Sequence, residues 1–229
     1  MRDTIKNLDY FEQFIREDEE RIKKFETKLL KGEVKNDRIL AAKMKVHDLK
    51  LGILIAKYSK GEKIENLVDQ CKELIQTFSD VWVPEFYIKN LWIVSLGILL
   101  NLEEEYLSII RNLVRKSKLN DWLINYLLDY KEEKSNEEYG ILQFPDTYKN
   151  LYDLIISSSE RNEKMKKYLE IDWYKGHSEC GFHDSHKSKQ NLYYGYWSFE
   201  SGAVAKILKI EDDNLKGLVY YPYDLVHFK

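Results

Sequence analysis

The sequence is 229 residues long, with 44% hydrophobic residues, 33% charged residues and a formal net charge of −3 at pH 7. This hydrophobic content excludes a disordered chain, and the length suits one compact domain or two small ones. The charge is uneven, because residues 1–118 carry 22 Lys and Arg against 20 Asp and Glu, whereas residues 119–229 carry 14 against 19. The acidic second half should repel nucleic acid and attract basic proteins.

Signals for export or membrane insertion are missing from the sequence. Met1-Arg2-Asp3 leads into a charged segment without the apolar core of a signal peptide. The longest apolar run, residues 91–100, is too short to span a bilayer. Cys71 and Cys180 are 109 positions apart and have no disulfide framework around them. We therefore expect a cytoplasmic, reducing location.

Hydrophobic periodicity predicts a succession of helices along the chain. Apolar residues recur at intervals of three and four between residues 8 and 29, and Gly32 is expected to end this first helix. Asp37 is expected to cap the second helix, Gly61 to end it, and Pro84 to lie in the first turn of the fourth. The expected ranges are 4–31, 37–59, 64–78, 84–100, 103–117, 120–131, 147–157, 159–172 and 196–209.

These elements predict an all-α protein, because no clean alternating run of β-branched residues occurs. We expect an antiparallel helical bundle or array of about nine helices without significant sheet. The 84–100 helix is apolar nearly all round and should lie at its centre. The weakest joint lies near 118–121, so we expect an N-terminal helical region, 1–118, and a C-terminal helical region, 119–229, packed as one compact unit.

The last third of the chain carries the most specific motifs. His186-Lys187 comes first, then a GYWSFE segment, a helix containing Ala203-Val204-Ala205, and a tail that reads YYPYDLVHF from residue 220 to residue 228. In this order the pieces resemble the PoNi-type immunity proteins, which protect bacteria from PoNe nuclease toxins. The N-terminal half resembles the family more loosely, in its length, its helical texture and its Asp9-Tyr10-Phe11 opening.

The resemblance implies a protein that acts by binding rather than by catalysis, without cofactor or metal. Its partner would be the C-terminal domain of a PoNe-type DNase toxin, a nuclease of the PD-(D/E)xK class, and it would contact neither nucleic acid nor membrane directly. It would cover the DNA-binding and active-site face of that toxin. The shared residues would maintain the fold; they are His186, Lys187, Gly195, Tyr196, Trp197, Phe199, Glu200, Tyr221, Pro222, Tyr223 and Asp224.

Acidic residues in and near the loops of the second half are the candidates for toxin binding. Exposed charges speed the encounter of two proteins, whereas buried aromatic residues supply affinity. The alternative interpretation is an ordinary solvated face. The candidates are Glu137, Glu138, Glu179, Asp184, Glu211, Asp212 and Asp213.

Two other functions fit parts of the pattern. A metal-dependent hydrolase could use His177, Cys180, His183 and His186, which are spaced by three as zinc ligands often are, with Glu200 as general acid or base. A structural hydrogen bond is the alternative role for Glu200.

A helical-array nucleic-acid binder could stack bases on the aromatic residues 193–199, although core packing suits them better because the flanking segment is not basic. No Gly-rich phosphate loop or nucleophile elbow occurs in the sequence. Tyr221-Pro222-Tyr223 is expected to dock the tail on the helices, with Asp224 capping a final short turn.

Overall fold

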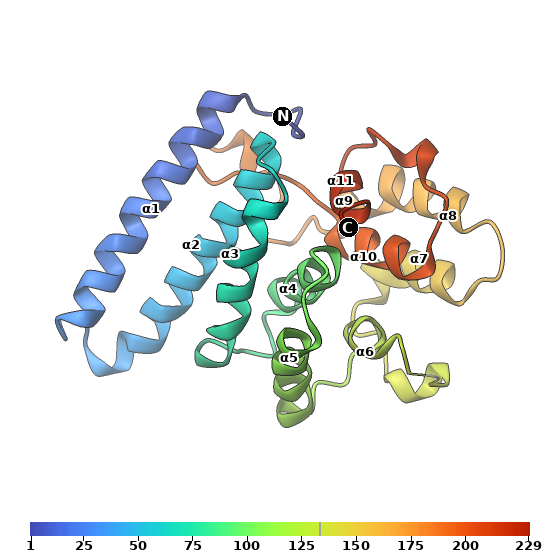
Figure 1. Cartoon of the computed structure of the whole chain (residues 1–229), viewed down its shortest axis with the longest axis horizontal. Coiled ribbons are helices and arrows are strands. Elements are labelled where there is room, and N and C mark those ends of the chain that lie inside the picture. The colour runs from blue at the N-terminus through green and yellow to red at the C-terminus, as the bar shows by residue number, and fades with distance from the viewer. Residues whose placement is uncertain (133) are drawn as a thin grey trace. The chain divides into compact units, whose positions relative to one another are not determined.

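The structure, a computed structural model, describes residues 1–132 and 134–229. Every regular element in these residues is helical, and one isolated parallel bridge joins Asp121 and Ile141 (Figure 1). The predicted all-α fold is confirmed. The chain forms two compact units, of which unit 1 comprises Met1–Val83 with Asp184–Gly195, and unit 2 comprises Pro84–His183 with Tyr196–Lys229. The division expected from the sequence at residue 118 stays a prediction.

Unit 1 is built on an antiparallel pair of long helices. They are α1 (Leu8–Leu30) and α2 (Ile39–Lys60), joined through the 3₁₀ turn η1 (Asn36–Arg38), with α3 (Glu65–Gln76) and η2 (Phe78–Asp80) following. The Asn7 side chain accepts a hydrogen bond from Tyr10 N and so caps α1. Gly61 ends α2 as predicted, because its φ of 96° is left-handed. Asp37 lies within η1 instead of capping α2.

Unit 2 is built around α4 (Tyr87–Leu99), which is buried on nearly every side and packs against α10 (Phe199–Leu208). The Asp121 side chain caps α6 by accepting a hydrogen bond from Ile124 N at 2.9 Å. The other elements are α5 (Glu104–Ser117), α6 (Trp122–Asp129), η3 (Asn136–Tyr139), α7 (Pro145–Ile156), α8 (Arg161–Lys167), the π-helical turn η4 (Tyr168–Asp172), α9 (Trp173–Gly176), η5 (Ser185–Lys187, in unit 1), η6 (Asp213–Leu215) and α11 (Tyr223–Val226).

Three predicted boundaries in unit 2 are wrong. Pro84 precedes α4 instead of lying in its first turn, and helical structure beyond residue 172 continues through α9. The helix expected from 196 begins at 199, because Ser198 has a non-helical backbone (φ −79°, ψ 76°) and its N–H donates to the carbonyl of Tyr220 at 2.8 Å. Asp224 lies in the first turn of α11, and Pro222 occupies the cap position.

No helix in the described part of the chain has both the length and the apolar character needed to cross a membrane.

Candidate functional site

The acid of the GYWSFE segment lies at the centre of unit 2. Glu200, in the first turn of α10, is fully buried. One oxygen of its carboxyl group accepts hydrogen bonds from the indole N–H of Trp173 at 2.5 Å and from the Ser198 hydroxyl at 2.9 Å. Its second oxygen has no hydrogen-bond partner among the described residues. We call Glu200, Trp173 and Ser198 the buried acid cluster.

Burial governs the protonation of this cluster. It raises the pKa of Glu200 from 4.5 to about 7, because the charged form loses its hydration and the hydrogen bonds from its own backbone N–H, Ser198 and Trp173 offset only part of that loss. Burial, followed by the nearby charge of Glu200, raises the pKa values of Tyr148 and Tyr168 well above the usual value for a phenol. A general acid has to reach its substrate. Full burial and structural hydrogen bonds therefore favour a structural role for Glu200.

The three histidines of the candidate zinc-ligand set, His177, His183 and His186, have separate partners. His177 is buried in unit 2, where its ring lies 3.0 Å from the Tyr148 hydroxyl and 2.6 Å from the carbonyl of Trp173. Burial lowers the pKa of His177 to about 4, so its ring is neutral at pH 7. His183 packs on Tyr174 in unit 2.

His186 belongs to unit 1, where its ring meets the edge of Tyr193. Within residues 1–132 and 134–229, no three His, Cys, Asp or Glu side chains form a possible metal site. The ligand set of the hydrolase alternative is therefore not assembled in this structure.

The segment 184–195, which contains the motif residues His186, Lys187 and Gly195, packs in unit 1. The Tyr10 hydroxyl donates to the carbonyl of Tyr193 and accepts from its N–H, both at 3.0 Å. The buried Tyr193 hydroxyl also donates to Asp3, and the Ser59 hydroxyl donates to the carbonyl of Tyr194 at 2.7 Å. His186 and Lys187 lie in the turn η5 that precedes these contacts, and Gly195 adopts a φ of 118°. These motif residues lie where the segment is anchored on α1 and α2.

The tail docks on α10, as the sequence predicts for Tyr221-Pro222-Tyr223. A Cβ added at Gly202 would lie 2.6 Å from the Pro222 ring, so the close packing of the tail needs a glycine there. The Tyr221 hydroxyl donates to Asp212 at 2.6 Å, and His227 lies 2.9 Å from the same carboxylate. Asp212 is only 4% exposed, and these two contacts from its carboxylate hold the tail in place.

The other acidic candidates have accessible side chains. Glu137 and Glu138 lie in η3, where the carboxylate of Glu138 accepts from the N–H of Ser135 at 2.7 Å and completes a capping box. Asp184, in unit 1, is 44% exposed and pairs with Lys187 at 2.8 Å. The remaining three are exposed in unit 2; they are Glu179, Glu211 and Asp213.

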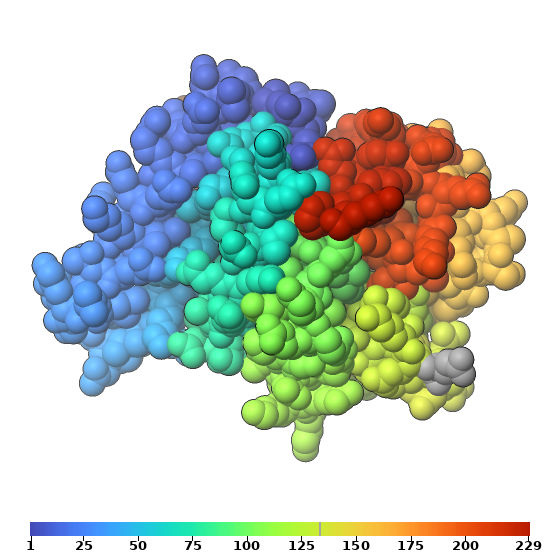
Figure 2. All heavy atoms as spheres, in the orientation of Figure 1, coloured from blue at the N-terminus to red at the C-terminus, as the bar shows by residue number. Residues whose placement is uncertain are grey.

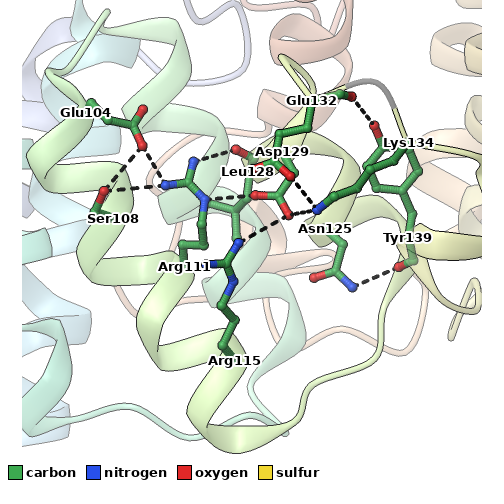
Figure 3. Close-up of polar contacts among 10 residues, drawn as sticks. All are labelled: Glu104, Ser108, Arg111, Arg115, Asn125, Leu128, Asp129, Glu132, Lys134 and Tyr139. Atoms are coloured by element: carbon green, nitrogen blue, oxygen red, sulfur yellow. Dashed lines mark hydrogen bonds and ion pairs between the residues drawn. The ribbon is translucent and has the colours of Figure 1, made fainter.

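A charged network that the sequence does not predict joins α5 to the end of α6 (Figure 3). Arg111 donates to the carboxylate of Asp129 at 2.8 Å, to the carbonyl of Leu128 at 2.7 Å and to Glu104 at 2.5 Å. Lys134 adds a second cation to Asp129 at 2.5 Å. Burial alone would raise the pKa of Asp129, but the hydrogen bonds from Lys134 and Arg111 outweigh it and hold that pKa below its usual value.

Glu104, Arg111 and Asp129 line part of a cavity of about 200 Å³ in unit 2, whose apolar lining includes Leu107 and Leu128. The buried charges of the network already have partners of opposite charge, which is typical of a structural ion network. Local sequence offers one signal for it, the spacing of seven between Glu104 and Arg111 on a single helix. Asp129 lies on another helix, so no periodic pattern connects it to Arg111.

Comparison with known families identifies the class of this fold. An all-α chain whose second half encloses a buried acid matches two models of immunity proteins along nearly its whole length. The model described as PoNe immunity protein (PoNi), N-terminal, matches residues 2–111, and the model described as PoNe immunity proteins (PoNi), C-terminal, matches residues 119–225. The chain belongs to the PoNe immunity protein (PoNi) family, as the resemblance of its motifs predicts.

Among solved structures, the chain is similar to the crystal structure of protein PA2201 from Pseudomonas aeruginosa. The two sequences are 15% identical, the TM-score is 0.57, and the match covers 83% of this chain and 75% of the other. This likeness shows a shared fold. The search of curated proteins found no match.

Proposed function

We propose that this chain binds a cognate PoNe-type DNase toxin and neutralises it by covering its DNA-binding and active-site face. Membership of the PoNi family is the observation that carries the proposal. The protein acts by occupying the toxin, without catalysis of its own. Because the DNA that such a toxin cuts lies in the bacterial cytoplasm, we propose that the immunity protein acts there.

The charge of unit 2 supports this mode of binding. Unit 2 carries 17 Lys and Arg against 22 Asp and Glu, whereas unit 1 carries 19 against 17. A nuclease surface that binds phosphates has to be basic, so an acidic partner is attracted to it and competes with DNA. The proposed contacts are the accessible acids of unit 2, Glu137, Glu138, Glu179, Glu211 and Asp213, together with Asp184 of unit 1 and without the buried Asp212.

The buried acid cluster supports the proposal indirectly. It links α9 to the start of α10 through hydrogen bonds among three fully buried residues, Trp173, Ser198 and Glu200. The family motif then maintains the scaffold, and the exposed loops are free to determine which toxin is bound. Since a single free nuclease molecule can cut a chromosome, the complex needs a nanomolar or lower Kd. This corresponds to a binding free energy of about −12 kcal/mol or stronger.

Co-expression tests the proposal. The nuclease domain of the toxin encoded beside this chain should kill a bacterial host when expressed alone, and the host should survive when this chain is expressed with it. An affinity tag on this chain should then retain the toxin domain. Killing despite equal expression of soluble immunity protein would contradict the proposal for that pair.

A double charge reversal sharpens this test. Glu211→Lys with Asp213→Lys should raise the Kd by about tenfold, because accessible charges at an interface affect mainly the rate of encounter. Glu12→Lys with Asp69→Lys changes two exposed acids of unit 1 and makes the same change in net charge. This control pair should retain the wild-type Kd.

A further inference from the structure

The outer half of the α1–α2 hairpin carries a concentration of positive charge, which we call the basic arm and define as residues 21–45. These 25 residues carry nine Lys and Arg against three Asp and Glu, in a chain whose total charge is −3. They comprise the C-terminal part of α1, the connection and the start of α2, which run antiparallel in Figure 1. Figure 2 shows this connected end of the hairpin in blue and light blue.

Most of this charge is free to act on a partner. Arg21 pairs with Asp18 at 2.8 Å, and Lys43 pairs with Asp80 at 3.0 Å. Six lysines are exposed and form no ion pair with any residue that the structure describes; they are Lys23, Lys24, Lys28, Lys31, Lys35 and Lys45.

The stability of the hairpin does not account for this clustering. Lys24 and Lys28 are four residues apart on one helix, and like charges at that spacing repel by a few tenths of a kcal/mol. Favourable interaction with the helix dipole is limited to the last turn, where Lys28 lies. Lys35 lies outside both helices. The arm therefore concentrates charge that folding itself does not need.

Apolar side chains at the same end of the hairpin indicate what kind of surface the arm fits. Leu30, the last residue of α1, is 90% exposed, and Leu40, in the first turn of α2, is 53% exposed. A nucleic-acid backbone offers phosphates to lysines but little apolar surface to leucines. An apolar centre within a polar, charged rim is the usual composition of a protein–protein interface.

We propose that the basic arm docks on an acidic surface of the cognate toxin that also has an apolar spot to receive Leu30. This inference rests on the function proposed above and adds a second contact of opposite sign to the acidic surface of unit 2. The two contacts together select a partner with both a basic and an acidic region. A protein with only one of these regions is then bound less well.

The test compares two triple variants in binding to the purified nuclease domain of the neighbouring toxin. Lys24→Glu, Lys28→Glu and Lys31→Glu reverse two lysines of α1 and the lysine that follows its last residue. Lys116→Glu, Lys167→Glu and Lys175→Glu reverse three exposed lysines of unit 2 and change the net charge equally. At 50 mM salt the arm variant should bind at least tenfold more weakly than wild type, and its Kd should depend less steeply on salt. The control should bind as tightly as wild type or more tightly.

Leu30→Ser supplies an independent variant, because a side chain that is 90% exposed contributes little to folding. It should weaken binding about threefold or more and leave the circular dichroism spectrum and the melting temperature unchanged.

The outcomes separate the two proposals. If wild type and the arm variant bind the toxin with equal affinity, the proposal that the basic arm docks on the toxin is wrong, and the proposed function is unaffected. A wild-type protein that does not bind the toxin would overturn the proposed function and the arm with it. If the arm variant loses binding only to a 30-base-pair DNA duplex, the arm contacts nucleic acid and the docking proposal is wrong.

Discussion

Replacing Trp173 with alanine is expected to lower the free energy of unfolding of unit 2 by about 4 kcal/mol or more. Trp173 is fully buried and packs against His177, with the ring centroids 4.9 Å apart, and against Tyr220 at 4.8 Å. Truncating a buried tryptophan to alanine typically costs about 3–5 kcal/mol. The variant also removes the indole N–H from Glu200, which costs about 1–3 kcal/mol more. Because whole proteins are stable by about 5–15 kcal/mol, urea titration should show a much earlier unfolding midpoint.

One further variant separates the effect of packing from that of the hydrogen bond, and a second is a control for burial. Trp173→Phe retains much of the ring but has no N–H, so it should lose only part of the stability lost by Trp173→Ala. Phe86→Ala removes an aromatic side chain that is 44% exposed and should cost clearly less than Trp173→Ala. If Trp173→Ala unfolds at the wild-type urea concentration, Trp173 does not have the central structural role that its burial indicates.

Glu200→Gln is expected to change how stability depends on pH. Below pH 4.5 the carboxyl group is protonated in both folded and unfolded chains and contributes no pH dependence. Between pH 4.5 and about 7 the unfolded chain releases this proton while the folded chain retains it, so the folded state loses stability as pH rises. The loss is complete above pH 7, at about 3 kcal/mol. Glutamine stays neutral throughout and escapes this loss.

The measurement is the difference in unfolding free energy between wild type and Glu200→Gln, from urea titrations between pH 4 and pH 8. The two proteins share every other titratable group, including the buried His177, so the difference isolates Glu200. The unfolding free energy of the variant relative to that of wild type should rise by about 3 kcal/mol between pH 4 and pH 8. A difference that stays constant with pH would mean that the folded chain does not raise the pKa of Glu200.

The helices were predictable because their apolar periodicity is local. The apolar face of α1 and the left-handed Gly61 follow rules that involve neighbours within about four residues. The two packing units were not predictable in this way. Tyr193 joins unit 1 through hydrogen bonds to Tyr10 and Asp3, and these partners lie 183 and 190 residues away in the sequence.

The candidate site shows the same division between local and distant information. The sequence indicates burial of Glu200, because the acid lies on an apolar helix, but it does not show which side chain donates to it. Trp173 is 27 residues away and on another element. Composition also groups Asp212 with its exposed neighbours, although Tyr221 and His227 hold it inside unit 2. The charge network around Arg111 depends on two helices meeting, which residue spacing alone does not reveal.

Titrating the DNase activity of the purified toxin domain with this protein tests the central claim most directly. The account predicts that cleavage of plasmid DNA falls in proportion to added immunity protein and ends near one equivalent, because a nanomolar complex is saturated at micromolar concentrations. Excess DNA added first should slow the inhibition if both bind one face of the toxin. Undiminished cleavage at tenfold excess of folded immunity protein would contradict the claim that this chain neutralises the toxin by binding it.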